Sequence, residues 1–262
     1  MAIPYYHVDA FTNVPFAGNP AGVCLLPAFP ADGLMQRIAA ENRHSQTAFV
    51  VRRPDGDFDL RWFTPAIEDD LCGHATLATA YVLALRGHAS WPVRFHTRSG
   101  VLAVSRDGER FEMDFPVWPP RPCAPPPGLL AALGVETARV FKTRDYLVVV
   151  EREAQVCALA PDLAALGRID IGIGGMIVTA PGDQDADYVS RFFAPSVGIG
   201  EDPVTGSAQC TLAPYWAEQL GKTALRAQQL SARGGELWCT VAGDRVGIAG
   251  EARLYLQGTL EL

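Results

Sequence analysis

The chain has 262 residues, of which 48% are hydrophobic and 19% are charged, which is enough to bury one large core or two modest ones. The net charge of −7 excludes the excess of lysine and arginine that proteins use to bind nucleic acids or anionic membranes. We therefore expect no nucleic-acid partner and no membrane partner. The 25 glycines and 20 prolines predict many turns, as in a β-rich fold rather than a helical bundle.

The N-terminus and the cysteines indicate a cytoplasmic protein. Residues 1–9 have neither the basic segment nor the apolar segment of a signal peptide. The longest apolar run, residues 76–85, has about half the length that spans a bilayer. The cysteines form no CxxC pair and are expected to be reduced; they lie at positions 24, 72, 123, 157, 210 and 239.

In the first half of the chain, aromatic and alternating residues predict a strand at 58–63. The Ala- and Leu-rich segment 75–85 contains neither glycine nor proline and predicts a helix, which Arg86 and Gly87 end. Glycine-containing turns then separate three further expected strands, at 93–97, 100–105 and 110–115.

The second half repeats this order. A strand is expected at 188–193, a helix at 208–220 that Gly221 ends, and two strands at 237–241 and 245–249. The proline-rich stretch 116–127 is the natural linker between the halves. One long helix in each of two β-rich halves predicts an α+β fold rather than the regular alternation of a doubly wound sheet.

The two halves also match in sequence, which predicts an internal duplication. Arg61-Trp62-Phe63 corresponds to Arg191-Phe192-Phe193 at a shift of 130 residues (191 − 61). At this shift Cys72 aligns with Asp202. Gly73-His74 then aligns with Gly206-Ser207 at a shift of 133 (206 − 73), so that residues 203–205 read as an insertion. The alternative is two unrelated strand–loop–helix units of similar composition.

A polar, glycine-containing turn precedes each predicted helix, at residues 70–74 and 201–207. A helix N-terminus leaves N–H groups unpaired and carries a partial positive charge. Two such ends facing one cleft would bind a substrate carboxylate. The alternative is that Asp70, Asp202 and Ser207 only cap helices, as these residue types often do.

Cys72 and Asp202, at matching places in the repeat, suggest one acid/base group from each half on opposite sides of a substrate. Cys72 is alternatively a small buried hydrophobe. His74 is a candidate general acid or hydrogen-bond donor, or a structural residue. The segment 41–50 is either a loop that closes on the cleft or a surface turn. No metal is expected, because no ligand spacing recurs among the other histidines, which lie at 7, 44, 88 and 96.

Segments that run in order over nearly the whole chain match those of a known family, at residues 9–12, 15–21, 45–49, 61–65, 71–76, 201–207 and 231–235. The chain resembles the PhzF-like phenazine-biosynthesis family, whose relatives include diaminopimelate epimerase. This resemblance implies two pseudo-symmetric lobes, each a curled, mostly antiparallel sheet around a central helix, with the site between the lobes. It also implies cofactor-free isomerase chemistry and a homodimer.

The resemblance also assigns roles to residues. The glycine-histidine pair of the family falls on Gly73 and His74, its aspartate on Asp202 and its helix-start serine on Ser207. The general-base glutamate of a Ser-Glu-Thr motif falls on Gln46, and an amide cannot accept a proton near neutral pH. Either another group is the base, or the substrate differs, or the protein has kept binding and lost catalysis.

We therefore expect an N-terminal lobe at 1–117, a linker at about 118–127 and a C-terminal lobe at 128–262, with a crossing of the chain between lobes near its ends left open. The predicted function is a cofactor-independent isomerase or epimerase that moves a proton on a small amino- or hydroxy-acid-like carboxylate. Asp202 and His74 exchange protons and Gln46 bonds the substrate. The remaining expected binding residues are Ser45, Cys72, Gly73, Gly206 and Ser207.

Two other functions remain open. One is a non-catalytic protein of the same fold that binds small anions. The other is a cysteine-dependent racemase that uses Cys72; the absence of a second cysteine at the position of Asp202 counts against it.

Overall fold

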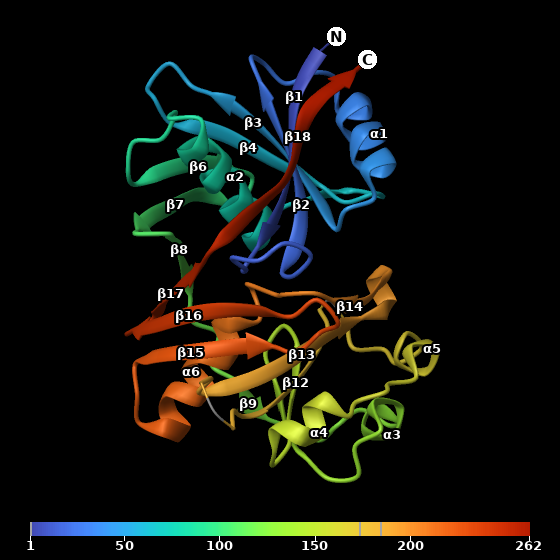
Figure 1. Ribbon diagram of the computed structural model, residues 1–262. Helices are drawn as coiled ribbons and strands as arrows, with labels where there is room; N and C mark the ends of the chain where they lie inside the picture. The colour runs from blue at the N-terminus through green and yellow to red at the C-terminus, as the bar shows by residue number, and fades with distance from the viewer. Residues whose placement is uncertain (1, 173, 184) are drawn as a thin grey trace. The chain divides into compact units, whose positions relative to one another are not determined.

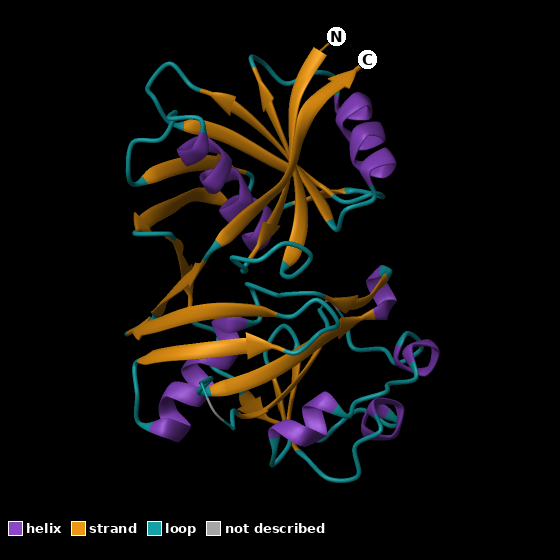
Figure 2. Cartoon of the chain, in the orientation of Figure 1, coloured by secondary structure: helices purple, strands orange, loops and turns teal. Residues whose placement is uncertain are grey.

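The computed structural model describes residues 2–172, 174–183 and 185–262. The chain divides into two compact units, which we call the first unit (residues 1–114 and 249–262) and the second unit (residues 115–248) (Figures 1 and 2). The expected linker at 118–127 lies within the second unit. The final residues, expected in the C-terminal lobe, belong to the first unit, because the last strand pairs with the first one along its whole length.

The first unit is a curled sheet with two helices. Strand β1 pairs with β18 and β2, β2 runs parallel to β3, β4 pairs with β3 and β5, and β4 runs parallel to β6, which begins the β6–β7–β8 meander. Its elements are β1 (Ala2–Ala10), β2 (Asn19–Leu26), α1 (Asp32–Asn42), β3 (Gln46–Arg52), β4 (Phe58–Phe63), β5 (Glu68–Asp69), α2 (Gly73–Leu85), β6 (Val93–Thr97), β7 (Gly100–Asp107), β8 (Arg110–Pro116) and β18 (Ala252–Glu261).

Helix α2 is the central helix of this unit, and it packs on β1, β2 and β3 (Figure 1). Nine of its thirteen residues are buried, which explains its even Ala- and Leu-rich composition, without a polar face. Its buried threonine hydroxyls are satisfied inside the helix: Thr79 Oγ1 donates to the carbonyl of Ala75 at 2.7 Å. Helix α1 covers a second apolar cluster, which includes Met35, Phe49 and Phe63.

The second unit repeats this topology. β10 pairs with β11, β11 runs parallel to β12, β13 pairs with β12 and β14, and β13 runs parallel to β15, which pairs with β16. Its elements are β9 (Arg121–Pro122), α3 (Leu129–Leu133), β10 (Arg139–Lys142), β11 (Tyr146–Val149), α4 (Glu153–Cys157), α5 (Leu163–Leu166), β12 (Met176–Pro181), β13 (Tyr188–Ala194), the 3₁₀ turn η1 (Pro195–Val197), β14 (Ile199–Asp202), α6 (Gln209–Leu220), β15 (Ala224–Gln229), β16 (Gly235–Ala242) and β17 (Arg245–Gly250).

Helix α6 is the central helix of the second unit, and it packs on β15 and β16. It contains Pro214, which lacks an N–H and so cannot bond the carbonyl of Cys210. The backbone N–H of Trp118 donates to that carbonyl instead, at 2.8 Å. The expected linker is therefore tied to the helix, and its residues 121–122 form β9, which pairs with β10.

The structure confirms the expected strands and both long helices, with small shifts at the ends. Helix α2 begins at Gly73 rather than at Ala75, and α6 begins at Gln209 rather than at Ala208. The mostly antiparallel sheets around central helices confirm the α+β prediction. No helix among the described residues is both long enough and apolar enough to span a membrane.

Candidate functional site

In the first unit, three polar side chains form a closed ring of hydrogen bonds. Asn19 Nδ2 lies 3.4 Å from His74 Nδ1, His74 Nε2 lies 3.2 Å from Ser45 Oγ, and Ser45 Oγ donates to Asn19 Oδ1 at 3.1 Å. Since the Asn19 amide nitrogen is a donor only, it makes Nδ1 of His74 the acceptor. His74 then carries its proton on Nε2, which donates to Ser45. Each of the three side chains thus donates one hydrogen bond to the next one around the ring and accepts one from the side chain before it.

The ring is built by local backbone features of three segments. Gly18 has φ of 69°, and a Cβ atom there would collide with the carbonyl of Ala10, so glycine is required just before Asn19 opens β2. Ser45 lies immediately before β3, and β2 and β3 run side by side in parallel. His74 is the second residue of α2.

His74 is neutral in this setting. Its side chain is enclosed, and burial, with a smaller contribution from the positive charge of nearby His44, lowers the pKa of its imidazole to about 3. Near pH 7 the imidazole of His74 therefore carries one proton, which it already donates to Ser45 in a hydrogen bond. This geometry favours His74 as a positioning and hydrogen-bonding group.

Cys72 lies beside this ring. Its Sγ atom is 3.6 Å from His74 Nδ1 and is buried. Cys72 is also the N-cap residue of α2, with an extended backbone, and its side chain does not cap the helix. The described cysteines are all free thiols.

Gln46 is the first residue of β3, and it faces a carboxylate. Its Nε2 atom donates to Asp69 Oδ2 at 3.1 Å, while its Oε1 atom is buried and has no hydrogen-bond partner among the described residues. Asp69 Oδ1 also accepts the backbone N–H of Leu71 at 3.4 Å. Asp69 ends β5 three residues before Cys72, so the carboxylate stands at the entrance to α2.

In the second unit, Asp202 is held in a compact turn. Its Oδ2 atom accepts a short hydrogen bond of 2.5 Å from Thr205 Oγ1. The buried amide of Gln229 donates to the Asp202 carbonyl at 2.7 Å and accepts the Thr205 backbone N–H at 2.9 Å. Asp202, Thr205 and Gln229 are each less than a tenth exposed. Gln229 therefore fixes the backbone that carries the Asp202 carboxylate.

Both central helices begin with uncapped N–H groups. In α2, the amides of Gly73, His74 and Ala75 precede the first helical hydrogen bond, and no N-cap side chain bonds them. Helix α6 begins with a 3₁₀ turn, because the N–H groups of residues 209–211 bond the carbonyls of residues 206–208, three positions earlier. Its unpaired amides are therefore those of Gly206, Ser207 and Ala208, for which the described part of the chain supplies no acceptor.

Arg144 lies at the start of α6 and was not identified from the sequence. Its Nη2 atom donates to Ser207 Oγ at 3.3 Å, and its guanidinium stacks on Trp118, 5.3 Å from the ring centroid. A guanidinium beside unpaired amides favours an anion. No sequence signal marked Arg144, because its partner is 63 residues away along the chain.

The structure supports the duplication but corrects its alignment. Arg61 forms a bidentate ion pair with Glu68, and Arg191 forms the same pair with Glu201, all at 2.7–2.9 Å. The arginines differ by 130 in number (191 − 61), whereas the glutamates differ by 133 (201 − 68). The three extra residues of the second copy thus lie before Glu201.

The counterpart of Asp202 is consequently Asp69, not Cys72. Asp69 pairs with Trp62 in the sheet, and Asp202 pairs with Phe192, one residue after each arginine. The prediction that Cys72 and Asp202 occupy equivalent places is therefore wrong, because residues 203–205 are not an insertion. Cys72 corresponds to Thr205.

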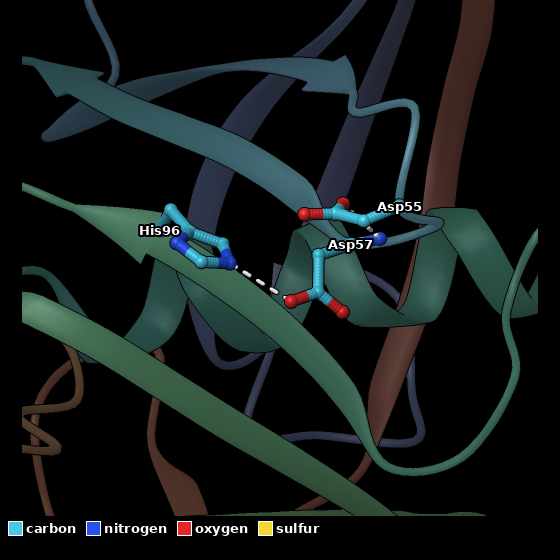
Figure 3. Close-up of side chains that lie close together, drawn as sticks. All are labelled: Asp55, Asp57 and His96. Carbon is cyan, nitrogen blue, oxygen red and sulfur yellow. Dashed lines mark hydrogen bonds and ion pairs between the residues drawn. The ribbon is translucent and has the colours of Figure 1, made fainter.

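Three residues of the first unit have ligand atoms of the kind that metals take. Atoms of Asp55, Asp57 and His96 lie within 4.8 Å of one another, and His96 Nε2 lies 2.8 Å from Asp57 Oδ2 (Figure 3). Asp55 is exposed and already pairs with Arg53 at 3.2 Å. The cluster is therefore explained by ion pairing at the surface. None of its three residues belongs to the hydrogen-bond ring of His74.

The fold identifies the broad class of the chain, an α+β protein of two similar units. The structure is similar to that of a probable proline racemase from Agrobacterium radiobacter, with a TM-score of 0.62 at 13% identity over 99% of this chain and 93% of that one. At this identity the likeness shows the fold alone.

The chain belongs to the PhzC-PhzF family of phenazine biosynthesis-like proteins, whose model matches residues 8–258. An uncharacterized isomerase of Pseudomonas aeruginosa is 56% identical over 263 residues and covers 100% of both chains. The human phenazine biosynthesis-like domain-containing protein is 37% identical, with 99% of each chain covered. The crystal structure of a PhzF-family protein from Enterococcus faecalis superposes with a TM-score of 0.96 at 45% identity, over 100% of both chains.

Proposed function

We propose that this chain is a cofactor-independent isomerase that moves a proton on a small substrate bearing a carboxylate. The observation that carries the proposal is the recurrence, in both units, of one arrangement: an aspartate followed closely by a helix start with three unpaired amides. The amides suit a carboxylate, and an aspartate suits proton transfer. Relatives named as isomerases support the reaction class.

In this proposal the amides of Gly73 and Gly206 and the Ser207 hydroxyl bind anionic groups, with Arg144 adding positive charge. Neutral His74 keeps Ser45 and the start of α2 in place. Asp202 accepts or donates a proton, and the hydrogen bond from Thr205 holds one of its carboxylate oxygens in place.

The test is exchange of substrate hydrogen with deuterated water, followed by NMR. The panel comprises the amino acids, cyclohexadiene carboxylic acids, and the compounds named for structural relatives, proline, 4-hydroxyproline and methylitaconate. Isomerase activity predicts deuterium at a single carbon of at least one compound. The proposal fails if the folded protein exchanges none of them.

A non-catalytic anion-binding function is the second candidate, and Gln46 favours it, since an amide stands where the family motif has its general base. Calorimetry with the same panel separates the two: binding without deuterium exchange supports the second candidate. The cysteine-dependent alternative is disfavoured by the counterpart of Cys72, which is Thr205 and not a second thiol.

A further inference from the structure

The side chain of Gln46 is oriented by one partner and is otherwise unsatisfied. It is 93% buried, since its relative exposure is 7%. Its Nε2 atom is directed at Asp69 at 3.1 Å, which leaves Oε1 without a donor among the described residues. A buried carbonyl oxygen that lacks a donor has lost its hydrogen bonds to water without replacement, so the arrangement suits a ligand that brings a donor to it.

Asp69 places a carboxylate next to the position where the family motif has one. Its Oδ2 atom lies one hydrogen bond from the Gln46 amide. A glutamate at position 46 would put its own carboxylate where that amide now lies. Compared with the family motif, this chain therefore has its carboxylate on strand β5 instead of strand β3. The two positions are about one hydrogen-bond length apart.

The duplication points to the same residue. Asp69 and Asp202 follow the paired glutamates Glu68 and Glu201, and they hold the same register against β4 and β13. Asp69 is partly exposed, and each of its oxygens accepts a single hydrogen bond. Since a carboxylate oxygen has two lone-pair sites, Asp69 retains room to take a proton.

We infer that Asp69 is the acid/base carboxylate of the first unit, and that Gln46 is a positioning residue whose free Oε1 accepts a hydrogen bond from a donor on the substrate. The inference rests on the proposed function and deepens it. Asp69 takes a proton from the carbon beside the substrate carboxylate, and the C–H electron pair is delocalised into that carboxylate. The neutral Asp69 acid then gives the proton to a conjugated carbon, which yields the isomer. Substrate and product are isomers, so the step needs no oxidant or reductant.

The experiment moves the carboxylate between the two positions. Asp69→Asn, Gln46→Glu and the double variant Gln46→Glu/Asp69→Asn are compared with the wild type on the compound that the wild type deuterates fastest. We expect Asp69→Asn to lower the exchange rate by about 10²–10⁴-fold, the usual effect of losing an acid/base group. The double variant, which restores a carboxylate one hydrogen bond away, is expected to recover at least about ten-fold over Asp69→Asn.

Asp70→Asn is the matched control, because Asp70 is the next residue and its side chain is 74% exposed; we expect exchange at the wild-type rate. Gln46→Glu adds a second carboxylate beside Asp69, and repulsion between the two is expected to move the acidic limb of the rate–pH profile to higher pH. A purely structural role would not move this limb.

The outcomes separate the inference from the function on which it rests. If the wild type exchanges a compound and Asp69→Asn exchanges it equally fast, Asp69 is not the acid/base group, and the proposed function stands. A folded double variant that stays at the level of Asp69→Asn also overturns the inference. If the wild type exchanges no compound of the panel, the proposed function and the inference fail together.

Discussion

Lowering the pH from 7 to 4.5 should destabilise the protein through His74. Burial lowers the pKa of this imidazole from 6.5 to about 3 in the folded chain. Between these values the unfolded chain binds a proton that the folded chain refuses, so the free energy of unfolding falls as the pH falls below 6.5. The contribution is fully present above pH 6.5. At pH 4.5 it has decreased by about 2–3 kcal/mol, at somewhat more than 1 kcal/mol for each pH unit below 6.5.

The assay is urea unfolding at pH 7 and pH 4.5 for the wild type and His74→Asn. The variant cannot titrate at this position, so its loss of stability between the two pH values should be smaller than that of the wild type by about 2–3 kcal/mol. His88→Asn, which changes an exposed histidine, is the control and should respond to pH as the wild type does.

Two results would refute this reasoning. The first is an equal pH response in the wild type and in His74→Asn. The second is an NMR signal of the His74 ring that titrates near pH 6.5 in the folded protein, since the ring would then be solvated rather than enclosed by Asn19 and Ser45.

Three further perturbations test the remaining parts of the site. Asp202→Asn should lower deuterium exchange by about 10²–10⁴-fold at an unchanged unfolding midpoint, because the amide oxygen still accepts from Thr205; normal turnover would reduce Asp202 to a structural residue. Gln229→Leu should lower the free energy of unfolding by about 2–4 kcal/mol, since it leaves buried backbone groups without their partner. The control is Gln228→Leu at the half-buried neighbour, which should cost less than about 1 kcal/mol. Equal losses would contradict the role of Gln229 in holding the backbone of Asp202 and Thr205. Arg144→Gln should raise the KM at least about ten-fold with little change in kcat, if it contributes only to substrate binding; a loss in kcat alone would show that it acts on the reacting atoms.

Local sequence patterns predicted much of the fold. Helix α2 and strands β6, β7 and β8 were predicted because composition and turn residues determine such segments locally. Helix α1 was not predicted, because its segment, residues 32–42, has a weak apolar stripe in which only Met35, Ile38 and Ala39 are buried. Segment 41–50 proved to be the end of α1, a short turn and the first five residues of β3.

The candidate site was predicted less completely, for a physical reason. Asn19, Asp69 and Arg144 acquire their roles from partners that are distant in sequence: Asn19 meets His74 across 55 residues, and Asp69 meets Gln46 across 23. No periodicity or local motif records such pairs. The repeat was found from sequence, but a gap placed after Asp202 instead of before Glu201 hid the equivalence of Asp69 and Asp202.

The arrangement that recurs in both units has different neighbouring residues in each, and this difference bears on the mechanism. In both copies an arginine–glutamate pair anchors the short strand that ends in an aspartate, and uncapped amides follow at the helix start. Beside the amides, the first unit has a neutral imidazole locked in a hydrogen-bond ring, whereas the second has the Arg144 cation. The surroundings of a carboxylate set its part in acid/base chemistry, and duplication alone would make two equal groups. Under the proposed function, the divergence of the surrounding residues is therefore what would let Asp69 and Asp202 take different parts in the proton transfer.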